Sequence, residues 1–377
     1  MRSLICLLAT LLPAAAQAQD DPQGTDRGRF GAAKDDLSKE VLEAADRGLQ
    51  YLARHQEPDG AWLAHVGFKV NADYSVTKQD SAHVGITALA LMAFLAQGHL
   101  PGRGKYGEKV SKAVDYLVSA SQENGYLSDN GTKMYSHAFA TLALAEVYGM
   151  TRSAEVRRVL QRSVDLICQC QNREGGWRYK PFAQESDMSI TVCQVMALRA
   201  ARNSGIHVQK NVIQDAVQYV RESENDRRGY GGRRRGWGGY GHGMDNGVFL
   251  YQRRANARAS FSLTAAGVTT LYGAGIYKDR LLDKGLEYMK EELRDFNSTW
   301  KGHYFFYYGN YYAVQAFHYA GGNNWDFYKR EIERCLLDLQ ERDGSWPNST
   351  GPGPNFSTAV GTLILSIPFN YLPIFQR

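Results

Sequence analysis

A recurring motif of glutamine, glycine and tryptophan constrains the fold of this chain more than any other feature. In each clear copy, glycine follows glutamine by four residues, and tryptophan follows glycine by two. The copies are RGLQYLARHQEPDGAW (47–62), RSVDLICQCQNREGGW (162–177) and EIERCLLDLQERDGSW (331–346). Apolar residues at helical spacing precede each glutamine, so each copy predicts an amphipathic helix that ends at a turn. Such self-similarity is typical of a repeat architecture.

Three weaker copies extend the pattern to six units, at residues 112–127, 215–230 and 284–296. A second, more apolar segment rich in alanine and glycine follows each copy. These second helices are expected at residues 81–97, 135–148, 188–203, 260–274, 307–320 and 358–371. Six helical hairpins therefore account for nearly the whole chain, and the predicted fold class is all-α.

The first copy carries a specific resemblance, in Arg47-Gly48, Tyr51-Leu52, Gln56, Gly60 and Trp62. This pattern resembles the QW motif of squalene and oxidosqualene cyclases and the repeats of prenyltransferase β subunits. The resemblance implies an α/α toroid of six helical hairpins, in which the second helices form an inner ring around a central cavity. It also implies that each motif glutamine bridges one helix end to the next helix, and that each motif tryptophan stacks over it. These residues are therefore expected to be scaffold.

The first 18 residues have the features of a Sec-type signal peptide, with Arg2, an apolar run and an Ala-x-Ala site ending at Ala18. They predict export to the periplasm or the extracellular space, with cleavage near Ala18. Residues 19–37 are polar and are expected to be a flexible lead. Residues 38–377 are expected to form a single toroid domain. No membrane span is predicted, because no run of 18 apolar residues occurs.

Candidate catalytic residues lie at the predicted beginnings of the inner helices, which should crowd one mouth of the cavity. Asp80 and Asp187 are expected to be N-caps there, and either carboxyl could act as an acid. His137 and His83 could act as an acid or a base near neutral pH. No metal or cofactor is predicted, because the chain lacks the D-x-D-D, D-D-x-x-D and D-x-C patterns of the resembled families.

An aromatic cluster at residues 304–312 supplies candidate substrate-binding residues. Aromatic faces suit carbocations, isoprenoid chains and sugar rings. The binding residues expected are Tyr135, Tyr307, Tyr308, Asn310, Tyr311 and Arg234. Arg234 belongs to a Gly/Arg-rich loop at residues 226–245, which is expected to be a lid, an anion-binding strip or a solvated insertion.

Three functions remain open from the sequence. The first is an exported enzyme, or binder, of an isoprenoid or other apolar substrate in the central cavity. The second is a non-catalytic toroid that binds a lipid or a partner protein, and the third is a polysaccharide lyase-like toroid. The formal net charge of +5 is too mild to imply nucleic acid as a partner. The oligomeric state and any disulfide among Cys168, Cys170, Cys193 and Cys335 stay open.

Overall fold

The computed structural model describes residues 38–68, 74–225, 247–253, 259–295, 301, 303–348 and 351–376. The predicted signal peptide, the lead and the Gly/Arg-rich loop with Arg234 lie outside these ranges. The predictions about them are therefore not tested by the fold.

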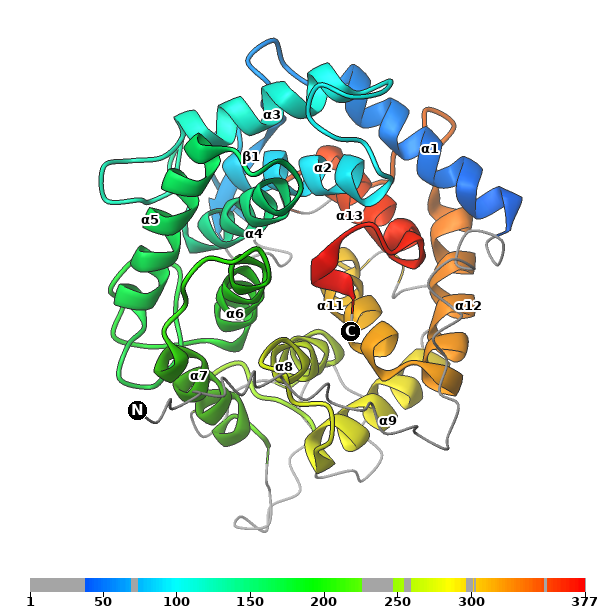
Figure 1. The fold of residues 1–377 in the computed structure, drawn as a ribbon. Helices are drawn as coiled ribbons and strands as arrows, with labels where there is room; N and C mark the ends of the chain where they lie inside the picture. The colour runs from blue at the N-terminus through cyan, green and yellow to red at the C-terminus, as the bar shows by residue number, and fades with distance from the viewer. Residues whose placement is uncertain are drawn as a thin grey trace, which may run out of the picture.

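Twelve helices in the described part of the chain form two concentric rings (Figure 1). The outer helices are α1 (Lys39–Arg54), α3 (Gly107–Ser119), α5 (Ala154–Cys170), α7 (Lys210–Glu222), α9 (Arg280–Asp295) and α12 (Gly322–Leu339). The inner helices are α2 (Val84–Ala96), α4 (Met134–Thr151), α6 (Met188–Asn203), α8 (Phe261–Gly273), α11 (Phe306–Ala320) and α13 (Pro354–Ser366). The last helices contact the first, since α13 packs on α1 and α2. The predicted α/α toroid is thus confirmed.

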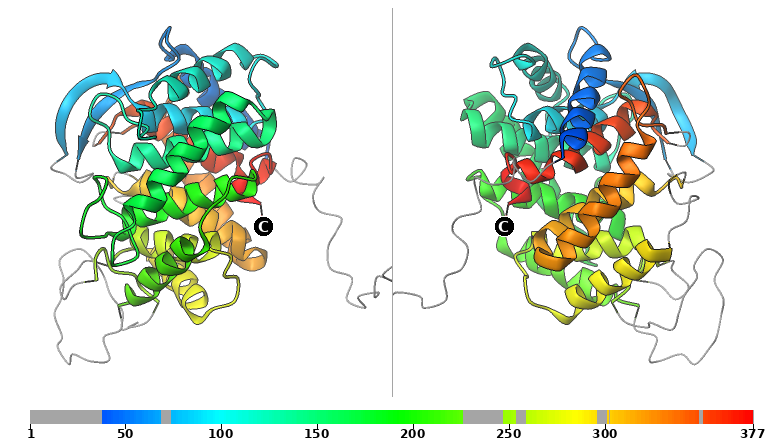
Figure 2. Two further views of the ribbon diagram at one scale, coloured as in Figure 1. Left: turned by 60° about the vertical axis from the view of Figure 1, so that its left-hand side comes forward. Right: turned by 90° about the vertical axis from the view of Figure 1, so that its right-hand side faces the viewer.

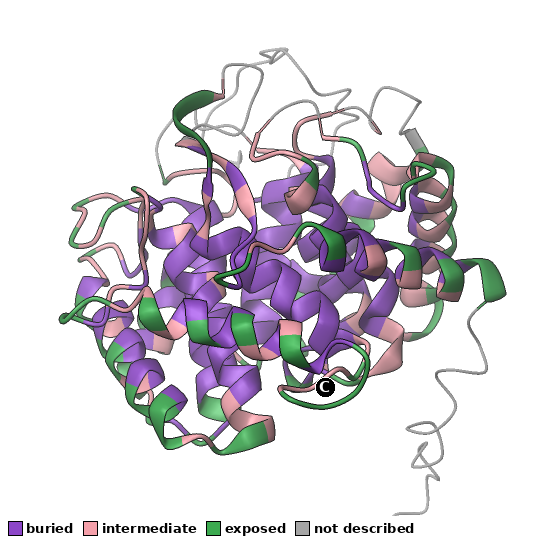
Figure 3. Ribbon diagram, turned by 90° about the horizontal axis from the view of Figure 1, so that it is seen from above, coloured by how far each residue is buried: buried purple, intermediate pink, exposed green. Residues whose placement is uncertain are grey.

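The two rings differ in how their side chains are buried. Every residue of α2 and α8 is buried, and the other inner helices are nearly as enclosed, because outer helices surround them and they pack on one another. The outer helices are amphipathic; in α1 the apolar residues Leu49, Leu52 and Ala53 face the core. Figure 3 shows the interior of the ring almost entirely buried, with most exposed residues on the outer helices, the loops and strand β2.

The motif glutamines bridge neighbouring hairpins through their side-chain amides. Gln56 Nε2 donates to Lys109 O at 2.8 Å, and Gln171 Nε2 donates to Val212 O at 2.8 Å. The third copy closes the ring, because Gln340 Nε2 donates to Ala44 O of the first helix, also at 2.8 Å. The predicted bridging role is therefore present in all three clear copies.

The motif tryptophans are fully buried and seal the ends of the outer helices. Each indole Nε1 donates to a backbone oxygen ten residues earlier: Trp62 to Leu52, Trp177 to Ile167 and Trp346 to Leu336, at 2.8–2.9 Å. These bonds satisfy carbonyl groups that a helix end otherwise leaves unpaired. Each tryptophan thus holds its turn against its own helix.

The motif glycine is required by both conformation and space. Gly60 has φ 93°, and a Cβ there would lie 2.1 Å from the Lys112 carbonyl oxygen. Gly344 has φ 92°, and its Cβ would lie 2.4 Å from the Arg47 carbonyl oxygen. A larger residue would be strained in this left-handed conformation and would push the neighbouring hairpin away.

The fourth copy of the motif is placed differently from the prediction. Gly247, with φ 91°, lies against Lys284, and the Phe249 N–H donates to the Thr264 hydroxyl as a motif tryptophan would. Gly247 and Phe249 therefore take the motif positions, whereas the predicted copy ends in residues 226–230, which lie outside the described ranges. An insertion of about twenty residues splits this copy of the motif, which hides it in the sequence.

A β-hairpin was also not predicted. Strands β1 (Leu63–Phe68) and β2 (Ser75–Ala82) pair antiparallel and project from the ring (Figure 2). Residues 75–80 are exposed, so the sequence of β2 lacks the apolar alternation that marks a half-buried strand. As a result α2 begins at Val84, whereas the predicted helix starts at residue 81. None of the helices in the described ranges is long and apolar enough to cross a membrane.

Candidate functional site

The N-terminal ends of the inner helices meet at one mouth of the ring, and Asp187 lies there as the N-cap of α6. Its Oδ1 accepts hydrogen bonds from the Ser189 hydroxyl at 2.6 Å and from the Ile190 N–H at 2.9 Å. Its Oδ2 accepts a longer bond of 3.3 Å from the Tyr251 hydroxyl. The predicted capping role of Asp187 is therefore confirmed, and one carboxylate oxygen faces a tyrosine.

Two loop tyrosines extend this contact away from Asp187. The Tyr251 hydroxyl lies 2.7 Å from the Tyr179 hydroxyl, so a hydroxyl chain leads from Tyr179 through Tyr251 to the carboxylate. Their backbone oxygens accept from the first residues of inner helices: Tyr251 from Met188 and Tyr179 from Met134. Because these bonds fix both loops on the helix ends, the hydroxyl chain is held by the scaffold itself.

Burial changes the acidity of this carboxyl group. Desolvation raises the pKa of Asp187 to about 6, although the bonds from Ser189 and Ile190 oppose the rise. The group is therefore mostly protonated in mildly acidic solution and can give up a proton near neutral pH. The same burial raises the pKa of Tyr179, so its hydroxyl stays a donor.

An aromatic wall continues from this point across the ring. The Tyr135 ring lies 6.2 Å from the Tyr179 ring and 6.4 Å from the Tyr308 ring, and Tyr308 lies 5.2 Å from Tyr312. The Tyr312 hydroxyl lies 2.9 Å from Cys193 Sγ, deep between α6 and α11. Tyr135, Tyr179 and Tyr308 are half-buried, so solvent still reaches the mouth. We call Asp187, Tyr135, Tyr179, Tyr251 and Tyr308 the tyrosine mouth.

The other predicted binding residues are distributed more widely. Tyr311 packs on Phe139 with ring centres 5.7 Å apart, deeper along the same axis as Tyr135. Tyr307 is buried beside Phe356, at 6.5 Å. Asn310 faces the outer ring, where its Oδ1 accepts from the Tyr328 hydroxyl at 3.0 Å. The structure therefore groups Tyr135, Tyr308 and Tyr311, but it places Asn310 away from the mouth.

His137 is held in a scaffold position. Its Nδ1 accepts the Leu127 N–H at 3.1 Å. In the clear copies the residue at this turn is tryptophan, and the Trp62 and Trp177 N–H groups donate to the hydroxyls of Thr87 and Thr191. Full burial lowers the pKa of His137 to about 3, so the imidazole is neutral. His137 thus replaces a structural threonine, and its predicted catalytic role gains no support from its contacts.

The prediction that Asp80 caps an inner helix is wrong. Asp80 lies at the end of β2 with its side chain exposed, and its Oδ1 is 3.4 Å from His65 Nδ1. The N-cap of α2 is His83, whose side chain accepts from the Ile86 N–H. His83 therefore corresponds to Asp187, and the predicted alignment was three residues out of register. Desolvation lowers the pKa of His83 to about 4.

Sequence reasoning missed Tyr179 and Tyr251, although a positional signal exists. Tyr179 lies two residues after Trp177, and Tyr251 lies two residues after Phe249, which holds the corresponding turn. The position two residues after the motif aromatic therefore marks a side chain at the mouth in both hairpins. The split fourth copy conceals the second of them.

The sequence matches the family described as "Prenyltransferase alpha-alpha toroid domain" over residues 32–236, which is more than half of the chain. The chain belongs to this family. A search of curated proteins found no match to this sequence.

Solved structures share the ring. An α-1,6-mannanase of Salegentibacter sp. HEL1_6 has a TM-score of 0.60 at 8% identity, over 88% of this chain and 99% of the mannanase. The type II terpene cyclase MstE from Scytonema has a TM-score of 0.58 at 12% identity, over 89% of this chain and 100% of the cyclase. An α-amylase from Clostridium perfringens has a TM-score of 0.59 at 9% identity, over 88% of this chain and 99% of the amylase. At such identities the likeness shows the fold alone.

The site chemistry of this toroid protein consists of a carboxyl, phenols and a thiol. Across the described ranges, no three histidine, cysteine or acidic side chains gather closely enough to hold a metal ion. Cys168, Cys170, Cys193 and Cys335 are free thiols, with Cys170 and Cys193 buried. The arrangement places aromatic faces near a buried carboxyl group whose pKa is raised to about 6.

Proposed function

We propose that the protein is an exported toroid that takes up an apolar small molecule, of the isoprenoid class, at the tyrosine mouth. The observation that carries this proposal is a buried carboxyl beside half-buried aromatic rings. Tyr135, Tyr179 and Tyr308 offer apolar faces, which favour alkene chains and attract positive charge. Export is inferred from the first 18 residues alone.

Asp187 is the proposed proton donor. Its raised pKa of about 6 keeps a useful fraction protonated near neutral pH, as a general acid requires. The Tyr179–Tyr251 hydroxyl chain supplies a route by which the proton could be replaced from solvent, since Tyr179 is half-buried. A carbocation formed by protonation would lie beside the electron-rich faces of Tyr135 and Tyr308.

A non-catalytic binding role is the second candidate, and one observation favours it. Asp187 is fully buried, and both of its oxygens already accept hydrogen bonds within the protein. The carboxylate is therefore satisfied without a ligand, as a purely structural N-cap would be. The lyase-like alternative has less support, because His137 is committed to Leu127 and Arg234 lies outside the described residues.

The test uses farnesol, geranylgeraniol and squalene as probes of the full chain. Binding is measured by calorimetry, and conversion is followed by mass spectrometry, for the wild type, Asp187→Asn and the surface control Asp165→Asn. The proposed enzyme binds at least one probe in all three proteins and converts it in the wild type and the control only. Binding without conversion supports the second candidate. Failure to bind any probe, with no lipid in extracts of the purified protein, overturns both.

A further inference from the structure

The far end of the ring axis is filled by the chain itself. Residues 370–376, called the axial segment, cross the middle of the ring at the C-terminal ends of the inner helices (Figure 1). Within it Leu372, Ile374 and Phe375 are 2% exposed or less. The tyrosine mouth lies at the N-terminal ends of the same helices, so the segment closes the opposite side.

Three inner-ring side chains hold the axial segment by its backbone. The Tyr319 hydroxyl of α11 donates to the Ile374 carbonyl, and Arg199 Nη2 of α6 donates to the Gln376 carbonyl at 3.0 Å. The Glu146 carboxyl of α4 faces the Ile374 backbone, which opposes the rise in the pKa of Glu146. Main-chain carbonyl groups of the segment are thus bound at both Ile374 and Gln376, as a protein binds the backbone of a peptide.

Two ionisable residues make this end unusual for an apolar ring. Glu146 is 3% exposed and Arg199 is 7% exposed, and each lies between buried alanine, leucine or valine residues of its inner helix. Arg199 lies over the Tyr319 ring at 4.8 Å and also bonds to the Tyr272 carbonyl at 3.2 Å. Buried polar and ionisable groups are costly unless they find partners, so these two side chains point to a built binding site.

The axial segment satisfies this site incompletely. Glu146 Oε2 is buried and has no hydrogen-bond partner among the described residues. The segment's own regular structure is one 3-10 turn, η4 (Pro373–Phe375), entered after Asn370 at φ 59°. An unpaired buried oxygen and a short irregular anchor both weaken the hold of the site on its occupant.

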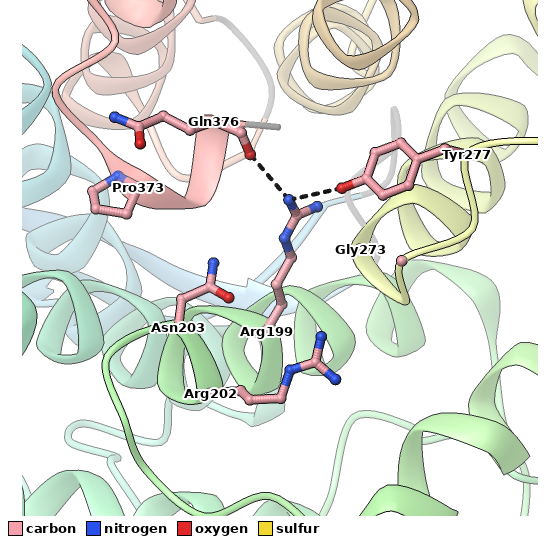
Figure 4. Close-up of a pocket in the computed structure, with 8 residues that line it drawn as sticks. Arg199, Arg202, Asn203, Gly273, Tyr277, Pro373 and Gln376 are labelled. Carbon is pink, nitrogen blue, oxygen red and sulfur yellow. Dashed lines mark hydrogen bonds between the residues drawn. The ribbon is translucent and has the colours of Figure 1, made fainter. Parts of the chain in front are cut away.

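Open space lies beside the segment. A cavity of about 430 Å³ is lined by Arg199, Arg202, Tyr277, Pro373 and Gln376 (Figure 4). In Figure 4 the Arg199 side chain reaches from α6 to both Gln376 and Tyr277 across this space. The segment therefore borders open space on its side toward α6 and α8.

We propose that Glu146, Arg199 and Tyr319 form a peptide-binding site and that the axial segment is its exchangeable occupant, a plug that opens while the ring stays folded. While bound, it closes this end of the ring and leaves the tyrosine mouth as the open end. When it leaves, the Glu146 carboxyl is open to solvent.

Native-state hydrogen exchange on the full chain tests this proposal. The Phe375 and Gln376 amides bond within the segment, and they should exchange at least tenfold faster than amides in the middle of α4, α6 and α11. Their exchange should also be insensitive to low urea, because little surface is exposed by local opening. Exchange of the segment only together with the ring, with the same urea dependence, would overturn the plug.

A matched pair of variants identifies what holds the segment. Tyr319→Phe removes the hydroxyl that bonds to Ile374, and it should speed exchange in residues 374–376 several-fold. Tyr148→Phe removes a hydroxyl from α4 that has no bond to the segment among the described contacts, and it should leave that exchange unchanged. Equal rates in both variants would contradict the assigned role of Tyr319. The wild-type urea series decides the proposal if Tyr319→Phe does not fold.

Discussion

His137 Nδ1 accepts the backbone N–H of Leu127 at 3.1 Å, in the place where Thr87 accepts the N–H of Trp62 at 3.0 Å. The imidazole and the hydroxyl therefore do the same task in neighbouring hairpins. Thr191 and Thr358 do it again for Trp177 and Trp346. A residue that resembles an acid or base in sequence is thus part of the scaffold that joins an inner helix to its turn.

Replacing His137 should affect stability in a graded way. His137→Ala leaves a buried N–H without a partner and should lower the free energy of unfolding by about 1–3 kcal/mol. His137→Thr offers a hydroxyl at the same helix position and should retain more of that free energy. Urea denaturation of both variants measures the difference. Equal losses, or an inactive His137→Thr variant of unchanged stability, would contradict the scaffold role.

Ring closure depends on Gln340. Gln340→Ala removes the amide that joins Gly344 to Ala44 of the first helix, and it should lower the free energy of unfolding by about 1–3 kcal/mol. Gln161→Ala is the control; the Gln161 amide is exposed and bonds to Asp165, and its loss should change the free energy of unfolding by less than about 0.5 kcal/mol. Thermal denaturation of the two variants provides the comparison, and similar midpoints would count against closure by this residue.

The proposed acid gives conversion a defined pH dependence. Because the pKa of Asp187 is raised to about 6, its protonated form declines as the pH rises through 6. Conversion of a bound probe should therefore fall about tenfold per pH unit above that point. Rate measurements from pH 4.5 to 8.5 would reveal it. A flat profile, or one that rises with pH, argues against proton donation by Asp187.

Glu146 gives stability its own pH dependence. Burial raises the pKa of Glu146 to about 8, so the folded protein holds this proton more tightly than the unfolded chain does. The contribution of this proton to the free energy of unfolding is fully present below about pH 4.5, and it is lost as the pH rises through about 8. The decrease in the free energy of unfolding that Glu146 causes should be on the order of a few kcal/mol, and Glu146→Gln should abolish it. Denaturation of wild type and variant at pH 5 and pH 9 tests this, and parallel losses would contradict it.

The architecture could be predicted because its signals are local and repeated. Helix α6 lies at the predicted residues 188–203, since Asp187 caps its beginning and Gly205 follows its end. Helix α2 was misplaced because β2 runs up to Ala82 and leaves the cap to His83. No local pattern distinguishes an exposed strand of this kind from a loop.

The site could be predicted only in part, because its members come from separate hairpins. Asp187, Tyr135 and Tyr308 lie on inner helices whose mouth the ring predicts. Tyr251 reaches Asp187 from a loop 64 residues away, and only the three-dimensional path of that loop brings them together. Glu146 could have been noticed, since a lone acid in the apolar run ATLALAEVYG is a strong signal of buried polar chemistry.

Photoaffinity labelling tests the central claim most directly. The full chain is irradiated with a diazirine analogue of geranylgeraniol, and the labelled peptides are mapped by mass spectrometry with unlabelled geranylgeraniol as competitor. If the ligand binds at the tyrosine mouth, peptides that carry Tyr135, Tyr179, Tyr251 and Tyr308 should be labelled, and the competitor should reduce this labelling. The labelling should be lost in Tyr308→Ala but kept in Tyr277→Ala. Competed labels confined to the cavity beside Arg199, or no competed label at all, would contradict it.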